Sequence, residues 1–224
     1  MYEYEMKLLG TPQQLQNTLD KFKSKVPLIK SRTVDFTTDY FDTSNKMFEK
    51  SGFSLRYRKT ENGYKQNVEL KELSGGKEDG ISKRIEITER NGGSFTSLYF
   101  NLLARPDYPN QALKPSPLFL ERIFQTSVVR DEEEFELTLP NGRVIQIESA
   151  FDQIKYIDKD GIMVGSDNEL EFEIHNLKDI DDMKAFVDWF DKVIYSECEC
   201  EKFFGSKAQR ARRFISLHST PAMV

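Results

Sequence analysis

The chain contains 224 residues, of which 31% are charged and 38% hydrophobic, and its formal net charge is −5. With 17 Phe and 9 Tyr, the chain is rich in aromatic residues, which is typical of a folded protein and excludes intrinsic disorder. No segment approaches the roughly 18 consecutive apolar residues of a membrane-spanning helix, and the acidic balance argues against a nucleic-acid partner. Neither a signal peptide nor a transit peptide is readable at the N-terminus, so we expect a cytoplasmic protein.

In chain order, the first half predicts mainly strands. Thr11 and Pro12 are a cap and a first-turn residue that favour a helix, and Asn62-Gly63 is a strong hairpin signal between two neighbouring strands. A loop is expected from Gly75 to Gly80. The predicted elements are strands at 1–9, 34–41, 53–59, 64–72 and 81–90, and helices at 11–25 and 95–104.

The second half repeats this arrangement after a Pro-rich connector at 105–117. The acidic run from Asp131 to Glu134 is predicted to be a solvated turn, and Pro140-Asn141-Gly142 is predicted to be another turn. Each half holds about four strands, which are too few to close a barrel alone, so we expect one barrel built from both halves. The predicted elements are strands at 123–129, 134–139, 143–151 and 168–174, and helices at 177–197 and 206–217.

Charged residues alternate with apolar ones along several of these strands. Because side chains on a strand have a period of two, Glu3, Glu5 and Lys7 share one face, while Met6 and Leu8 share the other. The apolar face must pack against helices, so the charges line the opposite side. Similar pairs or rows occur at Arg56 and Arg58, Glu69 and Lys71, Arg84 and Glu86, and Glu169, Glu171 and Glu173.

An open sheet with a solvated charged face would give the same alternation. We favour a closed barrel because the charges segregate, with acidic residues on the first and last strands and arginines between them. The planar guanidinium fork suits phosphate oxygens, and carboxylates suit Mg²⁺ or Mn²⁺. A lumen that carries both indicates a polyphosphate ligand bound together with divalent metal ions.

The order of short motifs carries a resemblance to a known family, because elements of one superfamily follow each other from residue 1 to about 217. The chain resembles the CYTH superfamily, the triphosphate tunnel metalloenzymes, and we expect one such domain at 1–217 with a tail at 218–224. The motifs are Glu3-Tyr-Glu-Met-Lys7, Tyr40-Phe-Asp-Thr43, Leu55-Arg-Tyr-Arg58, Glu69-Leu-Lys71, Ile147-Glu148 through Asp152, Glu169-Leu-Glu-Phe-Glu173 and Ser206-Lys-Ala-Gln-Arg210.

The resemblance implies an α+β fold, a closed eight-stranded antiparallel β-barrel with helices packed outside, which binds a triphosphate in its tunnel and uses Mg²⁺ or Mn²⁺. It implies catalytic roles for Lys7, Glu5, Asp152 and Glu148. The residues that it implies for triphosphate binding are Lys7, Arg56, Arg58, Lys71, Arg84, Arg130, Lys207 and Arg210, and those for metal binding are Glu3, Glu5, Glu171, Glu173 and Asp152. Glu169 is given no role beyond extending its row.

Within the superfamily, the likeness is greatest to domains that hydrolyse inorganic triphosphate to diphosphate and phosphate. Thiamine triphosphatases and class IV adenylyl cyclases share the tunnel and stay open as alternatives, as does a module that binds polyphosphate or nucleotide without turning it over. Monomer and homodimer are both open.

The remaining titratable residues receive no role in the site. Cys198 and Cys200 are the only cysteines, and their number and spacing make neither a disulfide framework nor a zinc site, so we expect free thiols. His175, assigned to the outward phase of its strand, and His218 are expected to be structural or surface residues.

Overall fold

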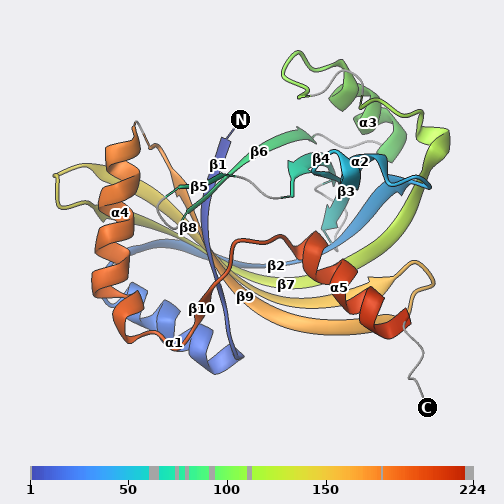
Figure 1. Ribbon diagram of the computed structural model, residues 1–224. Helices are drawn as coiled ribbons and strands as arrows, with labels where there is room; N and C mark the ends of the chain where they lie inside the picture. The colour runs from blue at the N-terminus through green and yellow to red at the C-terminus, as the bar shows by residue number, and fades with distance from the viewer. Residues whose placement is uncertain are drawn as a thin grey trace.

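The protein forms a closed antiparallel barrel, here described from a computed structural model for residues 2–60, 66–73, 76–78, 81–90, 94–109, 113–177 and 179–219. Eight strands close the ring in the order β1, β9, β8, β7, β2, β3, β4 and β6, and β6 pairs back to β1 (Figure 1). Two short strands extend it, since β5 pairs with β6 and β10 with β1. The barrel draws strands from both halves of the chain, and the predicted α+β class is confirmed.

The strands differ widely in length. They are β1 (Tyr2–Leu9), β2 (Leu28–Thr43), β3 (Phe53–Thr60), β4 (Gln66–Glu72), β5 (Gly76–Glu78), β6 (Ile81–Arg90), β7 (Leu120–Thr138), β8 (Val144–Asp158), β9 (Met163–His175) and β10 (Glu201–Lys202). The α-helices are α1 (Pro12–Lys23), α2 (Met47–Lys50), α3 (Phe95–Ala104), α4 (Ile180–Val193) and α5 (Lys207–Ser219), with 3₁₀ turns at Pro117–Phe119 and Tyr195–Glu197. Among the described residues, no helix has the length and apolar character needed to cross a membrane.

Local signals explain where several elements begin and end. The Thr11 hydroxyl accepts from the Gln14 amide, and the Gln14 side chain accepts in return from the Thr11 backbone, which is a capping box with Pro12 in the first turn. Gly142 adopts φ of 82° in the turn between β7 and β8, a conformation that glycine reaches without strain. These predicted signals are confirmed.

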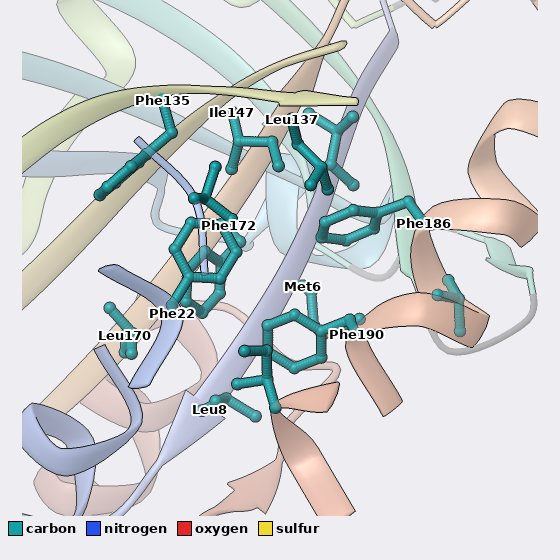
Figure 2. Close-up of a cluster of buried hydrophobic side chains, with 14 of the residues drawn as sticks. Met6, Leu8, Phe22, Phe135, Leu137, Ile147, Leu170, Phe172, Phe186 and Phe190 are labelled. Carbon is teal, nitrogen blue, oxygen red and sulfur yellow. The ribbon is translucent and has the colours of Figure 1, made fainter. Parts of the chain in front are cut away.

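The outer face of β1, β7, β8 and β9 is covered by α1 and α4. Met6 and Leu8 project from β1 into a cluster with Phe22 of α1, Phe172 of β9 and Phe190 of α4 (Figure 2). The ring centroids of Phe22 and Phe172 lie 4.8 Å apart, within the range of favourable aromatic pairs. A second cluster packs α2 and α3 on the outer faces of β3, β4 and β6 through Phe48, Leu55, Val68, Leu70, Ile87, Leu98, Tyr99 and Leu102.

The last helix, α5, packs on the inner face of the barrel rather than outside it. Phe36 and Val128 are directly paired neighbours on the face that also carries Arg58 and Arg130, and Ala208 and Ala211 of α5 join their cluster. Further members from the strands are Tyr40, Leu73, Phe124, Ile154 and Tyr156. Apolar side chains and α5 therefore fill one end of the lumen. The expectation that all helices lie outside is wrong for α5.

Three predicted boundaries also require correction. The acidic run 131–134 is not a turn but the middle of β7, where Glu132 and Glu133 are buried and pair with Arg32 of β2 and Lys23 of α1. Residues 76–78 form β5 instead of a loop. The helix expected at 177–197 begins only at residue 180, after Asp179 caps it, and ends at 193. The Asn62-Gly63 turn lies outside the described residues, but the antiparallel pairing of β3 and β4 is confirmed.

Candidate active site in the barrel interior

The strand register brings the alternating charges together inside the barrel. Glu3 of β1 lies opposite Arg84 of β6, while Lys7 lies opposite Glu171 of β9. Their outward neighbours Met6 and Leu8 are in the hydrophobic cluster, so the charged residues face inward. The predicted division into an apolar outer face and a charged inner face is confirmed for β1, β3, β4, β6 and β9.

One group of ions joins β1, β7, β8, β9 and α5. Arg130 donates from Nε and Nη2 to the two oxygens of Asp152, both at 2.7 Å, and from Nη2 to Glu171 at 2.9 Å. The Lys207 ammonium lies 2.9 Å from Asp152 and 3.2 Å from Glu171, and Lys7 also contacts Glu171. These cations hold the pKa values of Asp152 and Glu171 below their ordinary range in spite of burial.

A second group joins β1, β3, β4 and β6. The Lys71 ammonium contacts Glu3 and lies 3.2 Å from Glu86 and 3.6 Å from Glu5. Burial disfavours the charge on Glu86, but Lys71 and then Arg56 outweigh it and lower the Glu86 pKa. Arg56 also contacts Glu69, and the Glu5 carboxylate lies 2.6 Å from Lys7, so Glu5 connects the two groups.

Arg84 is the most deeply buried cation of the lumen, with 1% of its surface exposed. One end of its guanidinium contacts Glu5, but Nε and Nη1 are buried and have no hydrogen-bond partner. Burial lowers the pKa of Arg84. Unpaired buried donors are costly, so this guanidinium is arranged to donate to an anion from outside the chain.

Two arginines share one aromatic ring. The guanidinium carbons of Arg58 and Arg130 lie 4.4 Å and 5.5 Å from the centre of the Phe36 ring. Phe36 belongs to the apolar cluster that fills one end of the lumen. The ring therefore marks the boundary between the apolar end and the charged interior, and it holds two cations there.

The opposite end of the interior is acidic. Burial, then Glu3 and Glu148, raises the pKa of Glu173 to about 8. Burial and Glu132 also raise the pKa of Glu148. His175 belongs here, because it shares the phase of Glu173 and its Nδ1 lies 3.7 Å from that carboxylate. Its assignment to the outward phase was therefore wrong, since residues 173 and 175 differ by one full strand period.

Two sets of three carboxylates are close enough to hold a cation. In each set, one oxygen per residue lies within 4.8 Å of the others, and the members are Asp152, Glu169 and Glu171 in the first and Glu132, Glu134 and Glu148 in the second. Among the described residues, neither set includes Glu3, Glu5 or Glu173. Two predicted metal ligands, Asp152 and Glu171, thus lie together with a third carboxylate, Glu169. Of the other predicted ligands, Glu3 and Glu5 contact cations, and Glu173 lies at the acidic end.

Several interior residues were missed by sequence reasoning. Glu169 does more than extend its row, since it is fully buried and contacts Lys207 and Arg210 of α5. Arg210 also donates to the Tyr156 hydroxyl at 3.0 Å and lies 2.8 Å from Asp167. Glu69 and Glu86 could have been included, because each lies two positions from a predicted ligand, Lys71 or Arg84, on the same face of its strand. Glu132 and Glu134 were concealed by the turn that was wrongly predicted at 131–134.

The interior therefore combines two features. Within the described part of the chain, Arg84 has N–H donors without a partner, and carboxylates are grouped in sets of three. Such a site can bind a compact polyanion of several phosphates and, beside it, hard divalent cations. Its walls are closed by backbone hydrogen bonds between paired strands, which hold the charged groups in fixed positions relative to one another.

Solved structures confirm the fold. HpAC1 from Hippeastrum, described as an adenylyl cyclase candidate with a dominant triphosphatase activity, is 19% identical with a TM-score of 0.58, over 94% of this chain and 95% of that one. The PH1819 protein from Pyrococcus horikoshii is 18% identical with a TM-score of 0.56, over 94% and 98%. The mimivirus capping enzyme triphosphatase is 11% identical with a TM-score of 0.53, over 87% and 89%.

At these identities the likeness concerns the fold. No curated protein matches the sequence. The model of the CYTH domain family matches residues 1–199, which is most of the chain. The tunnel of eight antiparallel strands and the E-x-E-x-K start on β1 agree with that match, and the chain therefore belongs to the CYTH domain family.

Proposed function

We propose that the protein is a metal-dependent triphosphatase that hydrolyses inorganic triphosphate to diphosphate and phosphate inside the barrel. The observation that carries the proposal is the guanidinium of Arg84, which is buried in the lumen with Nε and Nη1 unpartnered. It stands among other cations and carboxylates that converge from β1, β3, β4, β6, β7, β8, β9 and α5. The triphosphatase activity reported for the Hippeastrum relative and the mimivirus enzyme supports the same substrate class.

The cations would bind the phosphate chain. Lys7 and Lys207 approach Glu171 from β1 and α5, while Arg56, Lys71 and Arg84 come from β3, β4 and β6. A triphosphate would exchange these intramolecular partners for phosphate oxygens without new side chains being brought in. The carboxylates that lose these partners keep their negative charge, and additional cations are required to compensate it.

The carboxylates fit Mg²⁺ or Mn²⁺. Hard oxygen donors are the ligands these ions prefer, and the Asp152, Glu169 and Glu171 set offers three of them within 4.8 Å. Glu173 fits as a further ligand, because neighbouring carboxylates and burial raise its pKa to about 8 and a cation would relieve that repulsion. When bound, the metal would supply charge neutralisation to the phosphate oxygens and lower the pKa of a bound water.

Among the chain's own groups, Glu148 is better suited than Asp152 to accept a proton from the attacking water. Asp152 is held by both oxygens to Arg130 and its pKa is lowered, which makes it a weak base. Burial raises the pKa of Glu148 and so strengthens it as a base. We assign Glu148 to the water, and Asp152 to positioning of Arg130 and Lys207 in addition to its place in the metal-holding set.

The apolar end of the lumen favours inorganic triphosphate. Because α5 and the cluster around Phe36 and Tyr156 fill that end, an organic substituent would have to extend through the acidic end. The described inward-facing residues there include Arg32, Glu132, Glu148 and His175, and apart from the imidazole of His175 they offer no aromatic ring for thiamine or adenine. Thiamine triphosphate and ATP are the alternatives.

The test measures phosphate release with Mg²⁺ and with Mn²⁺ from tripolyphosphate, ATP and thiamine triphosphate, with cyclic AMP measured in parallel. Turnover should be fastest for tripolyphosphate. Arg84→Ala should abolish this turnover. Lys83→Ala serves as a matched control, because Lys83 immediately precedes Arg84 in the chain and lies on the outer face, with its ammonium 4.7 Å from the centre of the Tyr2 ring. Cyclic AMP as the main product would establish a cyclase, and tight binding without turnover would establish a binding module.

A further inference from the structure

Two thiols outside the barrel converge on one hydroxyl group. Cys198 and Cys200 lie between α4 and β10, and their sulfurs are 3.0 Å and 3.4 Å from Thr18 Oγ1 on α1. Both cysteines are free. The triphosphate site makes no use of either thiol, although Cys200 belongs to the hydrophobic cluster under α1 and α4 and Glu201 begins β10.

The hydrogen bonding of Thr18 shows how the thiols are oriented. A hydroxyl has one proton to donate, and Thr18 Oγ1 donates it to the carbonyl of Gln14 at 2.9 Å. Its remaining lone pairs can only accept, so both contacts from sulfur are S–H donors aimed at the same oxygen. The two thiol protons therefore lie close together beside Thr18 Oγ1, and one cation could replace both.

The thiols are accessible from solvent through a hollow of about 160 Å³ in the surface between α1 and the segment after α4. Cys198 lines this hollow and is partly exposed, whereas Cys200 is buried behind it. Lys21 also lines the hollow and donates to Glu197 at 2.7 Å. Because Glu197 and Glu199 also line the hollow, its carboxylates outnumber its ammonium group, which favours a cation there.

Two sulfur ligands select the class of metal. A structural zinc site requires four ligands, and no set of three or more metal-ligating groups among the described residues includes these cysteines. Thiolates are soft ligands that select Cu(I), which accepts coordination by two sulfurs. We propose that Cys198 and Cys200 form a binding site for a thiophilic monovalent cation of the Cu(I) class.

Binding exchanges two protons for one cation. Cu⁺ displaces the S–H protons of Cys198 and Cys200, two Cu–S bonds form, two protons are released to solvent, and no group is oxidised or reduced. Thr18 Oγ1 loses two donors but keeps its own hydrogen bond to Gln14, so it remains satisfied. Burial raises the pKa of the Cys200 thiol, so proton competition weakens binding as the pH falls.

The test is an anaerobic titration of the fully reduced protein with Cu(I) presented as its bicinchoninate complex. The wild type should remove one Cu(I) per chain from the coloured complex. Cys198→Ser and Cys200→Ser should each weaken uptake roughly 100-fold or more, since each removes a ligand. Thr18→Val is the control that should retain uptake, because it removes the hydroxyl but leaves both sulfurs.

Alkylation of Cys198 in the wild type gives a second measurement that does not depend on folding of a variant, and it should also abolish uptake. The proposal is overturned if the wild type takes up no Cu(I), if either serine variant still takes up one Cu(I) per chain at wild-type affinity, or if alkylated protein does so. Equally tight one-to-one uptake of Zn²⁺ that both serine variants lose would also overturn it, since it would require further ligands.

Discussion

The two faces of β1 are buried to the same degree by different means. Met6 and Leu8 on the outer face are 1% and 0% exposed, and Glu5 and Lys7 on the inner face are 3% and 4% exposed. On the outside, helices α1 and α4 provide apolar partners. On the inside, Glu5 and Lys7 pair with each other and with charged residues of β4, β6 and β9.

The difference separates stability from function. Each fully buried apolar side chain on the outer face contributes roughly 1.5–3 kcal/mol to folding. Buried ion pairs contribute little net stability, because desolvation offsets their attraction, and apolar residues of similar size are often as stable. An interior lined by so many buried charged groups is therefore not explained by stability, and ligand binding explains it.

The largest expected effect concerns the inner face. Lys7→Ala and Glu5→Gln should each lower metal-dependent phosphate release from tripolyphosphate by roughly 100-fold or more, because each removes a charged group from the site. Steady-state rates and circular dichroism spectra of the purified variants measure this. Retained turnover in either variant would contradict the assignment of that residue, and loss of the folded spectrum would place it with the structural residues.

On the outer face the effect should appear in stability instead. Phe172→Ala removes a buried ring that packs on Phe22 and Phe190, and it should cost about 3–5 kcal/mol of unfolding free energy. Urea denaturation measures the loss, while activity per folded molecule should stay near that of the wild type. If activity fell with little change in stability, the division between the faces would be wrong.

A smaller effect should appear in the pH dependence of stability in metal-free protein. The raised pKa of Glu173, about 8 against an ordinary value near 4.5, means that the folded state binds this proton more tightly than the unfolded state. Its stabilisation is present below pH 4.5 and is lost as the pH rises through 8. Glu173→Gln should thus raise the melting temperature relative to wild type at pH 9, and this gain should shrink towards pH 5.

The acidic surroundings of Glu173 allow a check on that result. If Glu173→Gln gives the same melting-temperature difference at pH 5 and pH 9, then repulsion from Glu3 and Glu148 does not govern this carboxylate. The wild type with saturating Mg²⁺ should also lose most of its destabilisation at high pH, since the cation would compensate the carboxylates.

The smallest effect is expected at the exposed strand ends. Lys30 and Glu134 pair at 3.4 Å with both side chains largely in solvent, so Lys30→Ala should cost about 0.5 kcal/mol or less and leave turnover unchanged. Thermal denaturation at low and high salt measures the difference. A large loss would mean that solvent-exposed ion pairs also stabilise the barrel, and it would weaken the contrast drawn for β1.

Alternation was enough to predict the barrel strands, because each one carries apolar residues every second position, as Met6 and Leu8 do. Composition misled at 131–134, where four consecutive acidic residues resemble a solvated turn. Their partners, Arg32 of β2 and Lys23 of α1, lie about 100 positions earlier in the chain, and no local signal connects them. Strand pairing overrode the local preference.

The candidate site was predictable in part for the same reason. Because side chains on a strand alternate between its two faces, the sequence places Glu5, Arg56 and Glu171 on the inner face. The alternation does not identify which charges meet across the lumen. The position of α5 could not be predicted either, because an amphipathic helix packs equally well on either side of a sheet. Tyr156 and Asp167 consequently emerged as partners of Arg210 only from the structure.

The most direct test of the central claim, that the buried charges serve triphosphate binding, measures affinity and stability on one protein. Tripolyphosphate with Mg²⁺ should raise the melting temperature of the wild type in a concentration-dependent manner, and Arg84→Ala should lose that response while Lys83→Ala keeps it. An equal response in Arg84→Ala and the wild type, or no response in the wild type, would contradict the account.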